Sequence, residues 1–302
     1  MKKKYLSILL LLAYTLPFIT YAQETDTITK KEFSENAFTG TQLINSQTST
    51  IMPSNSWAFE VQHRFGKIGI DSSLTQQFLG LDLPAVMRIA FAWNITDRFY
   101  FKIGRTNIFK TYDIEGKYLL AKQTVDFKMP VSISLFFNSS IRSEKFPAVP
   151  KNSFFENDST AFFYKPSHRF AYNTQFIISS RISENFSMQV NPIFIYQNLA
   201  APYTDNFTLA LSSGARYKLG FSSAFIIEYA HVFNNRGARF YDPVSIGFEF
   251  GTPGHTFQLF ASTASKILET QIYTVSSVNA ANAEFMIGFN LQRSFWRKNK
   301  SN

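Results

Sequence analysis

The sequence predicts an all-β protein: a membrane-spanning antiparallel up-and-down β-barrel of about 12 strands (roughly 10–14). Three observations favour this fold. Apolar and polar residues alternate along many separate stretches, turn residues separate those stretches, and the connections between them alternate between short and long. Aromatic and charged residues each make up 17% of the 302 residues, a balance that suits strands facing lipid or a deep core.

The last stretch, residues 283–296, shows the alternation most clearly. Phe285, Ile287 and Phe289 fall on one parity, whereas Glu284 and Asn290 fall on the other. Because successive side chains of a strand point to opposite faces, this strand has one apolar and one polar face. A soluble strand with one buried face gives the same alternation, so the rest of the chain must decide.

Eleven further stretches repeat the pattern. Together the strands are expected over residues 56–65, 85–95, 98–106, 109–120, 131–141, 168–182, 186–197, 206–219, 222–233, 244–251, 256–263 and 283–296. No stretch after residue 22 carries the 3.6-residue apolar period over the length of a helix. The chain is therefore expected to form one large barrel over residues 56–296.

The lengths of the connections favour a membrane over a soluble β-sandwich, which is the alternative fold. Outer-membrane barrels have short turns on the periplasmic side and longer loops outside. With both chain ends periplasmic, nine of the eleven predicted connections follow this rule, and the exceptions are 106–108 and 121–129. A soluble sandwich has no reason to sort its loops in this way.

The first 22 residues have the composition of a secretory signal peptide. Lys2–Lys4 form a basic start, Leu6–Ile19 form an apolar run, and Thr20–Ala22 offer a small-residue cleavage site. A membrane anchor helix is the alternative, but the run is short and Pro17 interrupts it. The sequence thus predicts export to the outer membrane, with cleavage after Ala22.

Two polar segments flank the predicted barrel. Residues 23–55 are expected to form an irregular arm that lies in the lower mouth of the barrel, and residues 297–302 a polar tail. The net charge of +9 is scattered along the chain, which argues against a nucleic-acid-binding patch. The absence of cysteine excludes disulfides, thiol catalysis and cysteine metal sites.

Polar side chains on the inner parity of the strands are candidates for lining the lumen. The residues predicted to do so are Glu60, Arg64, Arg88, Arg98, Lys102, Arg216, Glu228 and Glu249. Both signs of charge are present, so ion pairs can fill and brace the interior. A pore lined with charges is the alternative. We expect a largely plugged or narrow lumen, with a ligand pocket at the outer mouth as the next choice.

Aromatic residues near the strand ends are candidates for an interfacial girdle. The predicted girdle residues are Trp57, Trp93, Tyr229, Phe295 and Trp296. The longest connection, residues 142–167, is also rich in aromatic residues. These rings can fold inward as a constriction, meet a ligand or partner, or pack on the barrel rim and the interfacial lipid.

The sequence predicts no catalytic residues, no metal site and no cofactor. The four histidines lie in different strands or strand ends, and none forms an H-E-x-x-H motif. A barrel hydrolase would pair a serine with a histidine, for example Ser179 or Ser180 with His168. However, no G-x-S-x-G elbow is present.

Seven short segments together resemble a known family. They are Gln62–Gly66, Gly80–Asp82, Ile95–Arg98, Ile103–Thr106, Lys110–Asp113, Met129–Ser132 and Gly254–Leu259. From about residue 37 to its end, the chain resembles an uncharacterised family of β-barrel proteins from Bacteroidota outer membranes, known only as a domain of unknown function. The resemblance implies a membrane barrel of Gram-negative type and assigns no activity to any residue.

These observations predict an integral outer-membrane β-barrel for passage or binding of a small solute. One alternative is a receptor or structural barrel that presents the 142–167 loop, and a less favoured one is an outer-membrane hydrolase. The expected partners are outer-membrane lipid and either a small solute or a periplasmic protein, but no nucleic acid.

Overall fold

The computed structural model describes residues 32–71, 73–155, 160–200, 204–234, 236–237, 239–252 and 254–296. The predicted signal peptide and the polar tail lie outside the described residues. No helix in the described part of the chain is long and apolar enough to cross a membrane.

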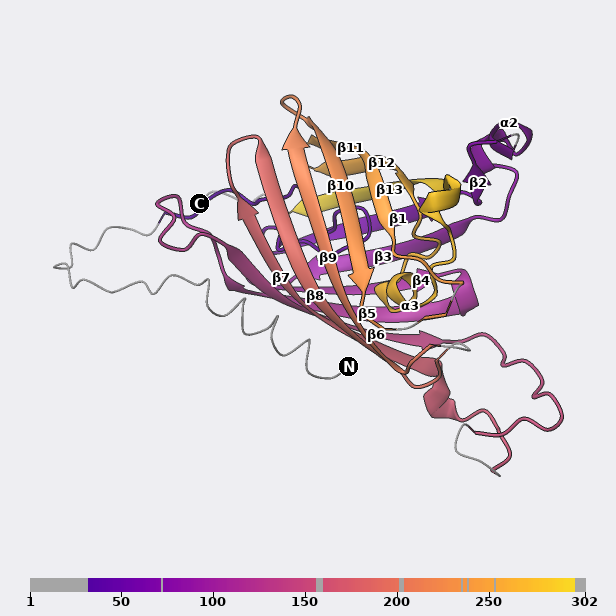
Figure 1. The fold of residues 1–302 in the computed structure, drawn as a ribbon. Helices are drawn as coiled ribbons and strands as arrows, with labels where there is room; N and C mark the ends of the chain where they lie inside the picture. The colour runs from indigo at the N-terminus through magenta and orange to yellow at the C-terminus, as the bar shows by residue number, and fades with distance from the viewer. Residues whose placement is uncertain are drawn as a thin grey trace, which may run out of the picture. The chain divides into compact units, whose positions relative to one another are not determined.

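Twelve antiparallel strands form a closed barrel (Figure 1). The strands are β1 (Ser56–Arg64), β3 (Val86–Asn94), β4 (Phe99–Thr106), β5 (Thr111–Ala121), β6 (Ser132–Arg142), β7 (Phe170–Arg181), β8 (Phe186–Gln197), β9 (Phe207–Lys218), β10 (Ser223–Val232), β11 (Val244–Thr252), β12 (His255–Ser262) and β13 (Glu284–Trp296). Each barrel strand pairs with the next, and β1 closes the barrel on β13, with Ser56 opposite Trp296. The predicted fold class is confirmed.

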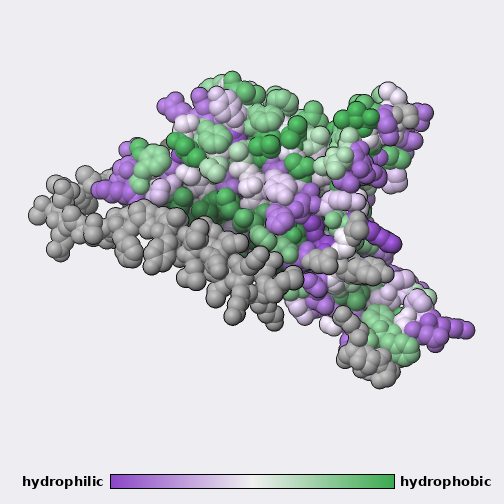
Figure 2. All heavy atoms as spheres, in the orientation of Figure 1, coloured by the Kyte–Doolittle hydropathy of each residue, from purple (hydrophilic) through white to green (hydrophobic). Residues whose placement is uncertain are grey.

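The strand faces follow the period-two pattern of the sequence. In β3, Arg88 and Ala90 are buried inside the barrel, whereas Ile89, Phe91 and Trp93 are exposed on its outer wall. Hydrophobic residues gather on the visible part of the wall around β10 and β11 (Figure 2). Hydrocarbon is the surrounding that suits an exposed apolar surface of this extent.

The connections define two ends of the barrel. The short-turn end carries the β3–β4, β5–β6, β7–β8, β9–β10 and β11–β12 connections, and the long-connection end carries the others. The β6–β7 connection extends away from the barrel at the lower right of Figure 1. The two exceptions to the sorting by length remain: the β4–β5 connection is short, and the β5–β6 connection is long for its end.

Short elements lie in several connections. They are β2 (Ile68–Gly69), which pairs with the start of β13, α2 (Ser73–Gln76), α3 (Glu269–Val275) and the 3-10 turns η1 (Phe78–Gly80), η2 (Ile108–Lys110), η3 (Pro166–Arg169) and η4 (Ala280–Asn282). Sequence periodicity does not detect α3, because this helix has only seven residues and those at 269–274 are all buried.

The arm before β1 enters the lumen from the short-turn end and returns to it. It starts with a bridge between Phe33 and Thr124 and ends where the Asn55 N–H donates to the Asn94 carbonyl. Between these points the chain reverses, because the Leu43 N–H donates to the Ser46 carbonyl at 2.9 Å. Residues 43–52 are all buried. The arm therefore reaches deeper than the lower mouth that the sequence predicts.

The β12–β13 connection inserts from the opposite end. Ile272 and Tyr273 of α3 pack against Ile193 of β8 and Ala210 of β9. Phe38 and Ile44 of the arm form a separate apolar cluster with Phe260 of β12. Two segments thus fill the described lumen from opposite ends, and each has its own apolar contacts with the wall.

Candidate functional site

Ion pairs brace the inner wall across four neighbouring strands. Arg88 contacts both carboxylates of β5: its Nε is 3.1 Å from Asp113 Oδ1, and its Nη2 is 2.7 Å from Glu115 Oε1. Lys102 Nζ lies 2.7 Å from Glu60 Oε2 and 3.2 Å from Glu115 Oε2. All five side chains are almost completely buried. Their charges therefore compensate one another in the absence of water.

Other inward-facing side chains hold the arm. Glu228 accepts hydrogen bonds from the backbone N–H groups of Asn45, at 3.0 Å, and Ser46, at 3.1 Å. Lys117 Nζ donates to the Thr41 carbonyl at 2.7 Å, and Arg64 Nη2 donates to the Ile44 carbonyl at 3.3 Å. These side chains of the wall thus provide hydrogen-bond partners for backbone groups of the irregular arm.

The structure brings most of the predicted lumen residues to the inner face of the wall. Glu60, Arg64, Arg88, Lys102, Glu228 and Glu249 are buried there, and Arg216 is half-buried with its Nε 2.8 Å from Glu249 Oε1. The prediction for Arg98 is wrong. This residue lies in the β3–β4 turn and is exposed, because β4 begins only at Phe99.

Three residues of the inner network are not among the lumen residues predicted from the sequence: Asp113, Glu115 and Lys117. They alternate along β5 with Tyr112 and Ile114, which are exposed outside. This alternation was the signal that could have found them.

Four of the predicted girdle residues gather at the short-turn end. Trp57 faces Trp93 on one neighbouring strand and Phe295 on the other, and its ring stacks on that of Phe295 with centroids 4.1 Å apart. Trp296 ends β13 beside them. Tyr229 lies toward the opposite end, where its hydroxyl donates to Asp242 at 3.1 Å. Their position at a membrane interface stays a prediction.

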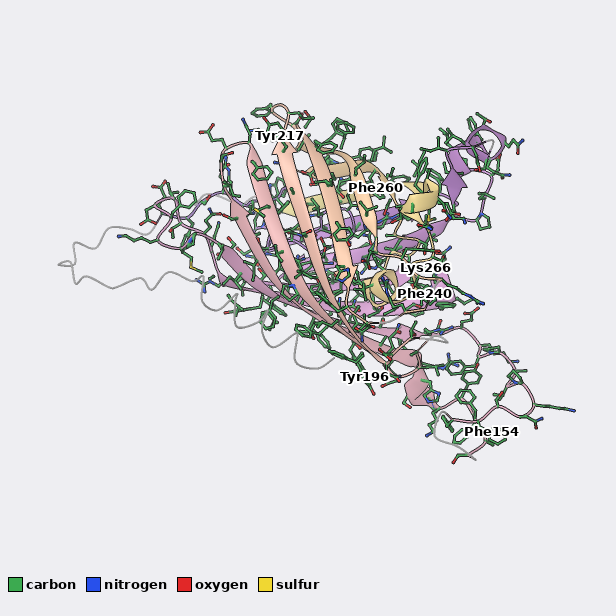
Figure 3. The ribbon with its side chains drawn as sticks, viewed as in Figure 1. Phe154, Tyr196, Tyr217, Phe240, Phe260 and Lys266 are labelled. Atoms are coloured by element: carbon green, nitrogen blue, oxygen red, sulfur yellow. The ribbon has the colours of Figure 1, made fainter. Side chains whose placement is uncertain are left out.

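A pocket of about 490 Å³ lies at the long-connection end; we call it the mouth pocket. Its lining includes Phe109, Arg142, Phe162, Tyr164, His168, Arg169, Phe240, Lys266, Thr270 and Gln271. Thr270 and Gln271 belong to α3, so the pocket and the inserted segment share this helix. Lys266 and Phe240 lie beside α3 in Figure 3.

Aromatic contacts shape the side of the mouth pocket formed by the β6–β7 connection. The Phe146 and Tyr164 rings stack with centroids 4.2 Å apart, and Phe162 stacks on His168 at 6.0 Å. Phe154, nearer the tip of the connection, lies far from Lys266 (Figure 3). Only the part of the predicted aromatic loop near its two ends therefore reaches the pocket.

Asp242 fixes the position of a second connection, β10–β11, at the mouth pocket. Its carboxylate accepts from Arg236 Nη2 at 2.5 Å and from the Val232 N–H at 3.2 Å, and it lies 2.7 Å from His231 Nδ1. Arg236 Nη1 also donates to the carbonyl of Tyr273 in α3. These contacts hold the β10–β11 connection, which carries Phe240, against α3.

The serine–histidine pairs considered for a hydrolase are not formed. His168 precedes β7, whereas Ser179 and Ser180 lie near its other end, about 30 Å away at roughly 3.3 Å per residue. Ser179 hydrogen-bonds instead to Ser49 of the arm. Across the described ranges, no group of three or more histidine, aspartate and glutamate side chains is placed to hold a metal ion.

The closed barrel with an apolar outer wall and a polar interior defines a membrane-bound β-barrel protein. The chain belongs to the family described as "Membrane bound beta barrel domain (DUF5777)", whose profile matches residues 38–295. This confirms the resemblance of the short segments to a family of membrane β-barrels of unknown function, and the origin in Bacteroidota stays a prediction.

Solved structures of similar fold include barrels named as porins and channels. The NanC porin is 6% identical, with 80% of this chain and 100% of that chain covered and a TM-score of 0.47. The KdgM porin is 7% identical, with 79% and 99% covered and a TM-score of 0.46. The COG4313 outer membrane channel from Pseudomonas putida F1 is 11% identical, with 82% and 98% covered and a TM-score of 0.44. No curated protein matches the chain.

Proposed function

We propose that the protein is an outer-membrane barrel that binds a small solute in the mouth pocket and admits it to the lumen when the inserted segments move. The long connections face the outside of the cell in this proposal, as they do in other outer-membrane barrels. Export by a signal peptide cleaved after Ala22 belongs to the same proposal.

The proposal is supported mainly by the position of α3, which lines the mouth pocket and also fills part of the lumen. Thr270, Gln271 and Val275 line the pocket. Glu269, on the same helix, accepts a hydrogen bond from Gln47 of the arm. A solute in the pocket therefore lies against the element that must be displaced before it can pass. Binding shifts such an element toward its displaced position only if the solute binds the displaced state more tightly than the inserted state.

Solute uptake by proteoliposomes tests this function when the arm is tethered to the wall. Ser49 Oγ contacts Ser179 Oγ of β7, and the protein has no cysteine of its own. A Ser49→Cys/Ser179→Cys protein should form a disulfide under oxidising conditions. We expect uptake by the reduced double variant to match the wild type and to fall severalfold on oxidation.

The two single-cysteine variants are the controls, and oxidation should leave their uptake unchanged. The proposed function would be overturned if proteoliposomes with the wild-type protein took up none of the small solutes tested faster than empty liposomes do. Uptake that is unaffected by the disulfide would show that the solute passes without movement of the arm.

A second candidate is a receptor barrel that presents the β6–β7 connection. Phe154 and Phe163 favour it, because both rings are exposed. Phe154 lies far out on this connection (Figure 3). A double Phe154→Ser/Phe163→Ser protein should then lose capture of a partner protein and keep its solute uptake. Loss of uptake with unchanged capture would argue for the first candidate.

A further inference from the structure

We propose that the mouth pocket is selective for small organic anions that carry a carboxylate on a six-membered ring, with Lys266 as the principal contact of the carboxylate. This inference rests on the proposed function, because it names the class of solute for the same site. Three features of the pocket support it: the unpaired positive charge, the lack of acidic residues in the lining, and the flat rings.

Lys266 is the strongest candidate contact for an anion. The residue lines the pocket and is only partly exposed, yet its ammonium has no ion-pair or hydrogen-bond partner among the described residues. A half-buried charge without a partner is costly, because the protein replaces only part of its hydration. A carboxylate in the pocket would supply the missing partner.

Two arginines add positive charge to the same wall. The Arg142 guanidinium lies 3.8 Å from the centroid of the Phe109 ring, and its buried Nε has no hydrogen-bond partner in the part of the chain that the structure describes. Arg169 Nη1 donates to the carbonyls of Arg142, at 2.8 Å, and Glu144, at 2.7 Å, which fixes the position of its side chain. Because guanidinium groups present several donors in one plane, they suit a carboxylate.

The described lining offers no carboxylate that competes for this position. None of the described residues that line the pocket is acidic. Arg142 forms a long ion pair with Glu144, whose Oε2 is 3.9 Å from Arg142 Nη2 on the partly exposed rim. Lys266 therefore brings to the pocket a positive charge that no described acidic side chain pairs, in contrast to the ion pairs of the lumen.

The aromatic side chains in the rest of the lining favour a solute that contains a ring. Phe162, Phe170 and Phe240 line the pocket from three different segments, and Phe162 already stacks on His168. Aromatic faces bind other rings by stacking. A volume of about 490 Å³ is in the range of sites for small organic molecules, roughly 300–1,000 Å³. An aromatic acid and a sugar acid share the chemistry that these residues recognise.

Isothermal titration of the detergent-solubilised protein tests the proposal with matched pairs of probes. Benzoate is compared with benzyl alcohol, and glucuronate with glucose. We expect at least one of the two acids to bind ten-fold or more tightly than its neutral counterpart. Raising the salt concentration should weaken binding of the acid only, because salt screens the attraction between charges.

Substitutions of Lys266 test whether this side chain contacts the carboxylate of the solute. Lys266→Gln should weaken binding of the acid about ten-fold, equivalent to about 1.4 kcal/mol, and leave binding of the neutral probe unchanged. Lys266→Arg keeps the charge and should retain binding within a few-fold. Lys128→Gln is the matched control, because Lys128 is an exposed lysine of the β5–β6 turn at the opposite end.

The outcomes separate the inference from the function on which it rests. Binding of benzoate alone would assign aromatic acids, and binding of glucuronate alone would assign sugar acids; both results support the inference. Equal binding of acid and neutral probes, no binding of any probe, or no effect of Lys266→Gln would overturn it. In these cases the proposed function would still stand if proteoliposomes took up a neutral solute, and would fall with the inference if they took up none.

Discussion

Gln47 and Glu269 meet inside the barrel although 222 positions separate them: Gln47 Nε2 donates to Glu269 Oε1 at 2.8 Å. Gln47 belongs to the arm that enters from the short-turn end. Glu269 begins α3, which enters from the long-connection end. This hydrogen bond joins the two segments that fill the lumen, so displacement of one removes a buried partner from the other.

The β12–β13 connection should loosen as the pH rises. Burial, and to a lesser extent the nearby charge of Glu115, together raise the pKa of Glu269 from 4.5 to about 7, although the hydrogen bond from Gln47 and the charge of Arg88 act in the opposite direction. An acid with a raised pKa stabilises the inserted state fully below about 4.5, and this contribution is lost as the pH rises through about 7. Hydrogen exchange of residues 263–283, corrected for intrinsic rates, should show more opening at pH 8 than at pH 5.

A Glu269→Gln protein is the control for this pH dependence. The amide does not titrate, so the difference in exchange between the two pH values should disappear. An unchanged pH dependence in the variant would assign the effect to a different group.

Removal of the arm should open the lumen. Deletion of residues 37–52 takes away the buried segment and its apolar contacts with Phe260. We expect a clear increase of single-channel conductance in planar bilayers over that of the wild type. Deletion of α2, which has no buried residue, should leave the conductance unchanged. Equal conductance with and without the arm would contradict the view that the arm blocks the barrel.

The inner ion pairs should contribute strongly to stability. Arg88→Met leaves Asp113 and Glu115 without their arginine, and loss of one partner of a buried ion pair costs about 3–5 kcal/mol. Urea unfolding in lipid vesicles measures this free energy. Arg98→Met is the matched control, because Arg98 is exposed in a turn; we expect a change within about 0.5 kcal/mol. Similar losses for the two variants would argue against a role for the network.

Tryptophan fluorescence should report the membrane interface directly. The protein has three tryptophans, and Trp57, Trp93 and Trp296 are all exposed on the wall at the short-turn end. Lipids brominated near the headgroup should therefore quench most of the emission of the reconstituted protein. Bromines placed deep in the bilayer should quench less. Emission insensitive to every brominated lipid would place this end of the barrel outside the bilayer.

The wall of the barrel could be predicted closely from the sequence. Each predicted strand lies within about two residues of an observed one, because a period of two is visible within a single strand. The error at Arg98 comes from a strand end, where a turn residue continues the alternation by chance. Asp113, Glu115 and Lys117 show the same pattern, but sequence analysis did not assign them to the lumen.

The sequence alone determined the strands, their faces and the closed membrane barrel, since these depend on neighbours a few residues apart. Only the tertiary structure decided what fills the lumen and where the pocket lies. Asn45 meets Glu228 across 183 positions, and Lys266 and Phe240 come to line one pocket only in the folded chain. Contacts of this kind depend on how the wall closes around polar segments, and those segments carry no periodic signal of their own.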